Sequence, residues 1–355
     1  MSCAMAAPSV FSGRVLPQSV IVPVAAPIVL ATPLGAVAGL SVAQVPVMHR
    51  LPMAQLPASD PCRRSKDAPV VSLQQALVHR IECDATALEQ NRTTSIAKNA
   101  LKLSQDRGGC RLVQQALEAA DSDEARLALV ETLRGHIWEV TTCPHANHVL
   151  QKYIVTMKPG ACQFIIDEIM QQGAGSACKL ARHKYGYRVF QRLLEHLLPQ
   201  QKAQLISGLV TDCVSISMHR YGTFVMQHVL EYGSDAQREL VIAALVPHIS
   251  KLSMNNDACM VLDAALVKSD AESQELLIRA MLQTDGSIGA MAHTRRGHVV
   301  VLSLFELVGG ELLESAKRQI GKQSSSLNRN RFGRLVLNFV QVHCGSIVPA
   351  AIGGA

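Results

Sequence analysis

Seven strings of five residues recur along the chain with one arrangement of polar and apolar positions. They read CRLVQ, NHVLQ, YRVFQ, TFVMQ, CMVLD, GHVVV and RLVLN, and they begin at Cys110, Asn147, Tyr187, Thr223, Cys259, Gly297 and Arg334. The third and fourth residues are apolar, and the fifth is glutamine in the first four strings and aspartate in the next. On a helix, the first and fifth residues share a face one turn apart, and the second lies beside them. The first and fifth side chains could therefore hydrogen-bond to the edge of a flat polar ring, while an Arg, His, Phe or Met at the second position stacks on its face.

The segments that must position these strings form a repeat array. The strings start 37, 40, 36, 36, 38 and 37 residues apart, which is the spacing of a repeated supersecondary unit. Each unit is predicted to be helical: in YRVFQRLLEHLL, the apolar residues form one stripe of Val189, Phe190, Leu193 and Leu194. Because such short units cannot bury their stripes alone, they must stack, and the sequence predicts an all-α fold, an α-solenoid.

A row of such sites suits a single-stranded nucleic acid. A general protein-binding solenoid has no reason to repeat glutamine at one position beside a flat or long side chain. Each repeat could instead read one base, with hydrogen bonds to the base edge and stacking between successive bases. The net charge of +6 permits a polyanionic partner without requiring one.

With these strings in register, the chain resembles the Pumilio (PUF) family of RNA-binding proteins. The resemblance is carried by LSQDRGGCRLVQQALE (103–118), HANHVLQKYI (145–154), HKYGYRVFQRLLEH (183–196) and HRYGTFVMQHVLEYG (219–233), and it covers roughly residues 95–342. It implies helices that read RNA bases near residues 110, 147, 187, 223, 259, 297 and 334.

The resemblance also implies a base for each of the first five strings. Each RNA-binding triplet consists of the first, second and fifth residues of a string. The base that each triplet is implied to read is adenine for Cys110, Arg111 and Gln114; uracil for Asn147, His148 and Gln151; adenine for Tyr187, Arg188 and Gln191; uracil for Thr223, Phe224 and Gln227; and guanine for Cys259, Met260 and Asp263. Since RNA runs antiparallel to the repeats in this family, the implied core is approximately 5′-GUAUA-3′.

Several positions depart from the family's pattern. Tyr187 stands where Cys or Ser is usual, Thr223 where Asn is expected for uracil, and Asp263 where Glu is usual. The sixth and seventh strings fit no reading triplet, and no eighth repeat is detected. Lys152 and Arg192 could face the RNA phosphates or be ordinary solvated side chains, and both interpretations stay open.

The function that the resemblance implies is sequence-specific recognition of messenger RNA 3′ untranslated regions, for post-transcriptional repression or decay. The implied partners are single-stranded RNA and protein effectors of decay or translation, and the implied state is a cytoplasmic monomer with no membrane contact. Nuclear, nucleolar or organellar locations stay open. Two alternatives are a nucleolar RNA-binding factor of ribosome biogenesis and a protein-interaction scaffold.

No enzyme signature accompanies the repeats. The stretch GAGSACK (173–179) lacks the Gly-Lys-Ser/Thr ending of a phosphate loop. The ten cysteines include no CxxC pair and no Cys/His set at metal-ligand spacing, so they are expected to be buried, reduced thiols. His183 and His219 precede two of the strings and are expected to be structural. We therefore expect no catalytic residues, no metal and no cofactor.

The first 67 residues differ in composition from the rest of the chain. There is no acidic residue before Asp60, and an apolar stretch is interrupted by Pro23, Pro27, Pro33 and Pro46, which argues against a membrane span or a signal peptide. We expect a disordered Ala/Pro/Val-rich tail at 1–67, with a targeting segment left open, a repeat domain at 68–345 and a disordered tail at 346–355. The segment 72–90 is helical in pattern but lacks the string, so it is expected to cap the first repeat.

Overall fold

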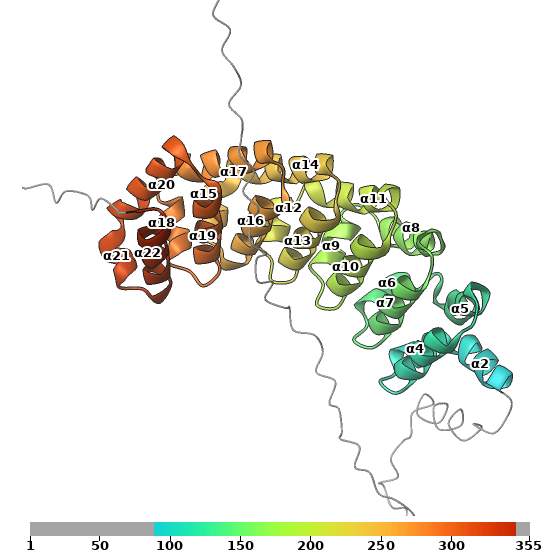
Figure 1. Ribbon diagram of the computed structural model, residues 1–355. Helices are drawn as coiled ribbons and strands as arrows, with labels where there is room; N and C mark the ends of the chain where they lie inside the picture. The colour runs from blue at the N-terminus through green and yellow to red at the C-terminus, as the bar shows by residue number, and fades with distance from the viewer. Residues whose placement is uncertain (1–88, 346–355) are drawn as a thin grey trace, which may run out of the picture. The chain divides into compact units, whose positions relative to one another are not determined.

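A computed structural model describes residues 89–345, and every regular element in that range is a helix (Figure 1). The predicted all-α solenoid is confirmed. The predicted tails at 1–67 and 346–355 lie outside the described residues, and so does the predicted cap up to residue 88.

Seven repeats follow one another in the described range, each with a short helix and a face helix, and the first six also have a back helix. The short helices are α3 (Ala100–Gln105), α6 (Ile137–Thr142), α9 (Ser176–Ala181), α12 (Cys213–Ser217), α15 (Ile249–Ser253), α18 (Ser287–Ala292) and α21 (Ser324–Asn328). The face helices are α4 (Gly109–Ala119), α7 (Ala146–Thr156), α10 (Gly186–His196), α13 (Gly222–Tyr232), α16 (Asn256–Lys268), α19 (Gly297–Leu307) and α22 (Arg331–His343). The back helices are α5 (Asp123–Val130), α8 (Gln163–Gln171), α11 (Pro199–Val210), α14 (Asp235–Leu245), α17 (Ala271–Gln283) and α20 (Gly310–Lys322). Three short 3₁₀ helices adjoin back helices: η1 (Glu131–Leu133), η2 (Pro159–Cys162) and η3 (Val246–His248).

The face helices pack side by side in sequence order from α4 to α22, and the back helices line the other side of the row (Figure 1). The third and fourth residues of the strings supply the shared core. Phe190, Met226 and Leu262 are fully buried in α10, α13 and α16, as are the equivalent residues of their neighbours. Burial of a large apolar side chain stabilises a fold by about 1.5–3 kcal/mol, so this repeated pair is what makes stacking favourable.

A small residue stands in the first turn of each face helix, where the helix crosses the short helix. It is Gly or Ala in all seven repeats: Gly109, Ala146, Gly186, Gly222, Ala258, Gly297 and Gly333. A Cβ at Gly109 would lie 2.4 Å from the carbonyl oxygen of Leu103, and one at Gly222 would lie 2.5 Å from that of Ile216. The close approach of the two helices therefore limits the side chain at this position.

The residue three positions before the small residue caps the face helix. In every repeat its side chain accepts a hydrogen bond from the backbone N–H of the small residue; the seven acceptors are Asp106, Cys143, His183, His219, Asn255, Thr294 and Asn330. Such a bond satisfies a donor that the first turn of a helix leaves without an intrahelical partner. His183 and His219 act through Nδ1, which is consistent with the structural role expected for them.

The small residue and the cap correct the register of the sixth repeat. Gly297 occupies the small-residue position, since a Cβ there would lie 2.4 Å from the carbonyl oxygen of Met291. The first residue of the sixth string is therefore His298, one position later than predicted, and the string is HVVVL. Val300 and Val301 are then the buried third and fourth residues, in agreement with the other repeats.

Helix α2 (Glu89–Lys98) covers the start of the row. It packs against α5, α4 and α3, and its contact with α5 corresponds to the contacts between successive back helices from α8 onward. Within residues 89–345, no helix is both long enough and apolar enough to cross a membrane.

Candidate nucleic-acid interface

The first, second and fifth residues of the first five strings lie on one side of the face helices, but the first residues are almost covered. Their exposed fractions are Cys110 5%, Asn147 1%, Tyr187 9%, Thr223 0% and Cys259 0%. The fifth residues are half-buried, and the second residues are half-buried or exposed. The surface offered to a ligand is therefore formed mainly by the second and fifth side chains.

In the first two repeats, the glutamine folds back over the first residue. Gln114 Nε2 donates to the carbonyl oxygen of Cys110 at 3.0 Å, and Gln151 Nε2 donates to Asn147 Oδ1 at 2.8 Å. Asn147 Nδ2 in turn donates to the carbonyl oxygen of Cys143 at 2.7 Å. A primary amide has two N–H donors and an acceptor oxygen, so a glutamine oriented in this way can still bond to a base edge. The exposed Arg111 and His148 lie beside these two sites.

An aromatic cluster takes the place of a hydrogen-bonding first residue in the third repeat. The Tyr187 ring stacks on Tyr221 at 5.3 Å between centroids and on Phe224, the second residue of the next repeat, at 5.7 Å. The Arg188 guanidinium lies 5.2 Å from the Tyr187 ring. Rings and guanidinium groups of this kind stack on bases without reading their edges.

The glutamine of the third repeat is bonded to the following face helix. Gln191 Nε2 lies 3.1 Å from His228 Nδ1, and His228 Nε2 lies 2.8 Å from Glu195 Oε1. Gln191 therefore contacts a histidine of the next repeat, which in turn contacts Glu195. The glutamines of the first two repeats bond within their own helices.

In the fourth repeat, the hydroxyl group of the first residue is already used within the protein. Thr223 Oγ1 donates to the carbonyl oxygen of Asp257 in the next repeat at 2.8 Å. Gln227 Nε2 donates to the carbonyl oxygen of Thr223 at 3.1 Å. Contact with a base at this repeat would therefore fall to Gln227 and Phe224.

The fifth repeat combines a buried thiol with a carboxylate. Burial raises the pKa of Cys259 to about 11, so the thiol stays protonated near neutral pH. Burial also raises the pKa of Asp263, and a hydrogen bond from Ser303 Oγ to Asp263 Oδ1 at 2.7 Å opposes that shift. A carboxylate can accept hydrogen bonds from the N1–H and N2–H₂ groups of guanine, which agrees in kind with the implied base.

The last two repeats carry no reading triplet in either register. The His298 ring stacks on Phe332 at 5.0 Å, and the second residues, Val299 and Leu335, are aliphatic and exposed. Arg334 is exposed and donates to the carbonyl oxygen of Asn328 at 3.3 Å.

Lys152 and Arg192, the two cations that could face the RNA phosphates, each form an ion pair with a carboxylate. Lys152 pairs with Glu118 of the preceding repeat, and Arg192 Nη1 lies 2.6 Å from Glu195 Oε2. An RNA phosphate would have to compete with these pairs.

Sequence reasoning missed the caps as a set, although they share a visible signal. An acceptor side chain always stands three residues before the small residue, and two of these acceptors, His183 and His219, were noticed only as isolated histidines.

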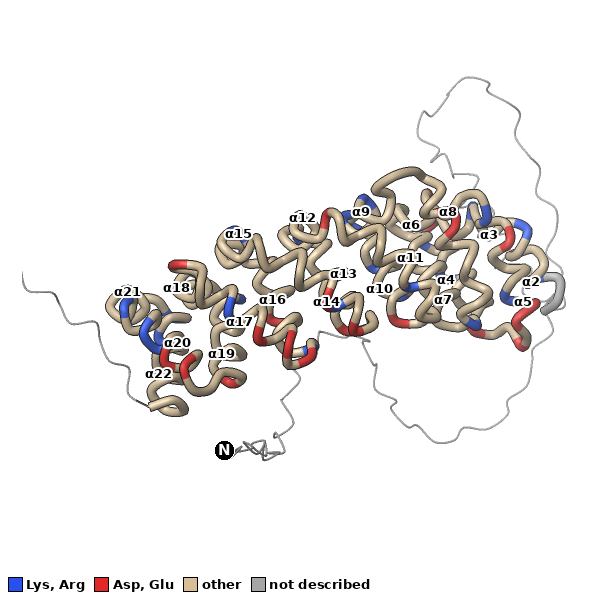
Figure 2. The backbone as a smooth tube through the Cα atoms, turned by 90° about the horizontal axis from the view of Figure 1, so that it is seen from above, with Lys and Arg blue, Asp and Glu red and all other residues tan. Residues whose placement is uncertain are grey.

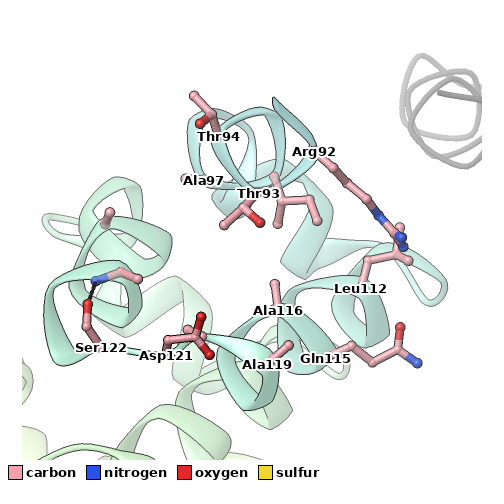
Figure 3. A pocket seen from close by; sticks show the side chains of 14 residues that line it. Arg92, Thr93, Thr94, Ala97, Leu112, Gln115, Ala116, Ala119, Asp121 and Ser122 are labelled. Atoms are coloured by element: carbon pink, nitrogen blue, oxygen red, sulfur yellow. Dashed lines mark hydrogen bonds between the residues drawn. The ribbon is translucent and has the colours of Figure 1, made fainter. Parts of the chain in front are cut away.

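Two further features of the described residues concern possible ligand sites other than the triplets. Over the described part of the chain, no group of three His, Cys, Asp or Glu side chains could hold a metal ion. A groove of about 1100 Å³ opens between α2, α4 and α5 at the start of the row, lined by small residues such as Ala97, Ala116 and Ala119 (Figure 3). It lies at the end of the array, and none of the predicted triplet residues lines it.

The sequence matches a model described as the Pumilio-family RNA binding repeat at residues 99–133, 136–170, 176–210 and 212–246. These four matches coincide with the first four repeats. Similar curated proteins include the Pumilio domain-containing protein C6G9.14 of Schizosaccharomyces pombe, 28% identical over 133 residues (37% of this chain and 19% of that protein). Suppressor protein MPT5 of Saccharomyces cerevisiae is 28% identical over 148 residues (37% of this chain and 17% of that protein). The matches therefore span less than a fifth of these relatives' own length.

Two solved structures share the fold over most of their length. One is PUF-8 in complex with PBE-RNA, with a TM-score of 0.66, 20% identity and coverage of 76% of this chain and 79% of that one. The other is the Puf3 RNA binding domain bound to a Cox17 RNA 3′ UTR recognition sequence, with a TM-score of 0.64, 18% identity and coverage of 76% and 77%.

Proposed function

The chain belongs to the Pumilio family, and from that premise we propose that it binds single-stranded RNA in a sequence-specific manner, with one base at each of its first five repeats. The observation that carries this proposal is the row of second and fifth side chains on consecutive face helices, with glutamine at the fifth position four times. The proposed core is approximately 5′-GUAUA-3′. In the third and fourth repeats, where Tyr187 is stacked and the Thr223 hydroxyl group is bonded internally, the base would contact the second and fifth side chains.

The cellular role we propose is recognition of messenger RNA 3′ untranslated regions in the cytoplasm. The chain would act as a monomer through recruited effectors of decay or translation, by binding and not by catalysis. The likeness to a domain bound to a 3′ UTR sequence supports this choice.

Selection of RNA ligands from a random pool at a stated salt concentration tests the proposal. Enrichment of a GUAUA-like core supports it. Salt-sensitive binding with no sequence preference would favour the ribosome-biogenesis alternative, because phosphate contacts carry no sequence information. Absence of RNA binding would favour the alternative of a protein-interaction scaffold.

The second repeat gives a sharper test. In Asn147→Ser/Gln151→Glu, the preference at that base is expected to move from uracil toward guanine by about tenfold or more, because both carboxylate oxygens can accept from the N1–H and N2–H₂ groups of guanine, whereas an amide has one acceptor oxygen. The measurement is the affinity for the core RNA with each of the four bases at that position. Arg334→Ser/Asn338→Glu makes the same kind of change in the seventh repeat and is expected to leave all base preferences intact. An unchanged preference in the second-repeat variant would show that the assigned register is wrong.

A further inference from the structure

At or just before the start of the face helix, five of the seven repeats carry a basic residue that the reading triplets do not explain. Two positions before the small residue, the seven repeats have Arg107, Pro144, Lys184, Arg220, Asn256, Arg295 and Arg331. All five cations in this set are exposed. We call Arg107, Lys184, Arg220, Arg295 and Arg331 the turn ridge.

Contacts between neighbouring turns place them in one row. The Arg296 backbone N–H donates to Asn256 Oδ1 at 3.2 Å, which joins the fifth and sixth turns. Asn330 Nδ2 in the seventh turn donates to the carbonyl oxygen of His293 beside the sixth at 3.1 Å. Stacking of Tyr221, in the fourth turn, on Tyr187 joins the third and fourth repeats in the same way. The turn ridge therefore follows the edge of the surface on which the triplets lie.

The ridge cations are not used in ion pairs that would account for them. None of the five pairs with a carboxylate of residues 89–345, whereas the adjacent Arg296 pairs with Asp257. Two lie against rings of their own turns: Lys184 Nζ is 5.1 Å from the Tyr185 ring, and Arg220 is 4.5 Å from the Tyr221 ring. A cation at the start of a helix also opposes the helix dipole. Apart from the ring contacts of Lys184 and Arg220, which stabilise only those two turns, stability of the fold gives no reason to repeat a cation in this place.

The ridge continues where base reading stops. Arg295 and Arg331 belong to the sixth and seventh repeats, whose second residues are aliphatic. Between residues 286 and 345 there are eight Lys or Arg and only three Asp or Glu. Blue segments accordingly gather near α20, α21 and α22 (Figure 2). This end of the array suits a polyanion whose bases need not be read.

We propose that the turn ridge binds the phosphate backbone of the RNA and that its last two members extend the binding site past the read core. This inference rests on the proposed function. Guanidinium and ammonium groups form charge-assisted hydrogen bonds with phosphate oxygens. Such contacts set position and affinity without reading sequence, so the sixth and seventh repeats bind flanking nucleotides of any sequence.

The test compares two double variants of the full chain that remove the same charge from the same end. Arg295→Gln/Arg331→Gln removes two ridge cations. Arg318→Gln/Lys322→Gln removes two exposed cations of the back helix α20, neither of which pairs with a described carboxylate, and it serves as the control. Affinity is measured over a range of salt for a single-stranded RNA with the GUAUA core and five uridines on each side, and for RNAs with one flank removed.

The ridge variant is expected to lower the slope of log affinity against log salt by about 1.4, since each phosphate contact to a single strand contributes about 0.7. Its preference for the core over a scrambled core should be unchanged. Because the RNA is expected to run antiparallel to the repeats, the loss of affinity should disappear when the 5′ flank is removed and should persist when the 3′ flank is removed. The control should match the parent. Equal effects of the two variants, or a ridge variant with the parental slope, would overturn the inference while leaving RNA binding intact. A parent chain that binds no RNA would overturn the proposed function as well.

Discussion

At the scale of single residues, Asp263 shows a conflict between binding and stability. Burial raises the pKa of this carboxyl group above its usual value of about 3.9. Its contribution to stability is therefore full below that value and is lost as pH rises through the folded-state pKa. Loss of the proton as pH rises therefore costs the free protein stability, and a guanine edge would supply hydrogen-bond donors to the ionised carboxylate.

Asp263→Asn is accordingly expected to stabilise the free protein at pH 7 and to weaken its preference for guanine by about tenfold or more. The asparagine oxygen can still accept from Ser303, whose hydroxyl group bonds to Asp263 Oδ1 in the parent. Urea unfolding and base preference at this repeat measure the two effects. Ser303→Ala is the companion variant: it removes the donor, so it should destabilise the protein. A lower urea midpoint for Asp263→Asn would contradict the interpretation.

At the scale of elements, the face helices depend on side-chain caps that differ in their response to pH. Asp106, Asn255 and Asn330 accept through oxygen, whereas His183 and His219 accept through Nδ1, which must be unprotonated. Burial lowers the pKa of both histidines. Their contribution to stability is therefore present above the unfolded value of about 6.5 and is lost as pH falls below it toward the folded-state pKa.

His183→Asn/His219→Asn is expected to keep both caps, because asparagine occupies the same position in the fifth and seventh repeats. The parent should lose more stability than this variant between pH 7 and pH 5. Replacement of one histidine by alanine should cost about 1 kcal/mol at pH 7, the usual value of a cap. Urea midpoints at the two pH values check the expectation. Parallel losses in the parent and the asparagine variant would show that the two histidines do not cause the pH dependence.

The face helices were predictable because two adjacent apolar residues return in every string, and their burial is the strongest local signal. The same signal failed in the sixth repeat. There, His298 is followed by Val299, Val300 and Val301, so more than one adjacent pair satisfies the pattern. The close approach of Gly297 to the short helix and its hydrogen bond to Thr294 decide between them. The low exposure of the first residue of each of the first five strings was not predictable from the sequence. It depends on how side chains are oriented in space: Gln151 folds back over Asn147, and Thr223 bonds to the next repeat.

At the scale of the whole array, stability comes mainly from contacts between neighbouring repeats. The interior face helices α10 and α13 each pack against a face helix on both sides. Helix α2, in contrast, contacts α4 and α5 beside a groove of about 1100 Å³ lined by small side chains such as Ala116 and Ala119 (Figure 3). Local opening should therefore need less free energy at α2 than at α10 or α13.

Amide hydrogen exchange of the full chain should show this gradient, with α2 exchanging faster than α10 and α13 by about tenfold or more, since each 1.4 kcal/mol in opening free energy is a factor of ten. Filling the groove by Ala116→Leu should slow exchange in α2, because the added side chain buries apolar surface there. It should leave α13 unchanged, because the face helices α7 and α10 stand between α4 and α13 in the row. Uniform exchange along the row, or a variant that slows α13 as much as α2, would mean that the repeats open together, and the nearest-neighbour description of this array would then be wrong.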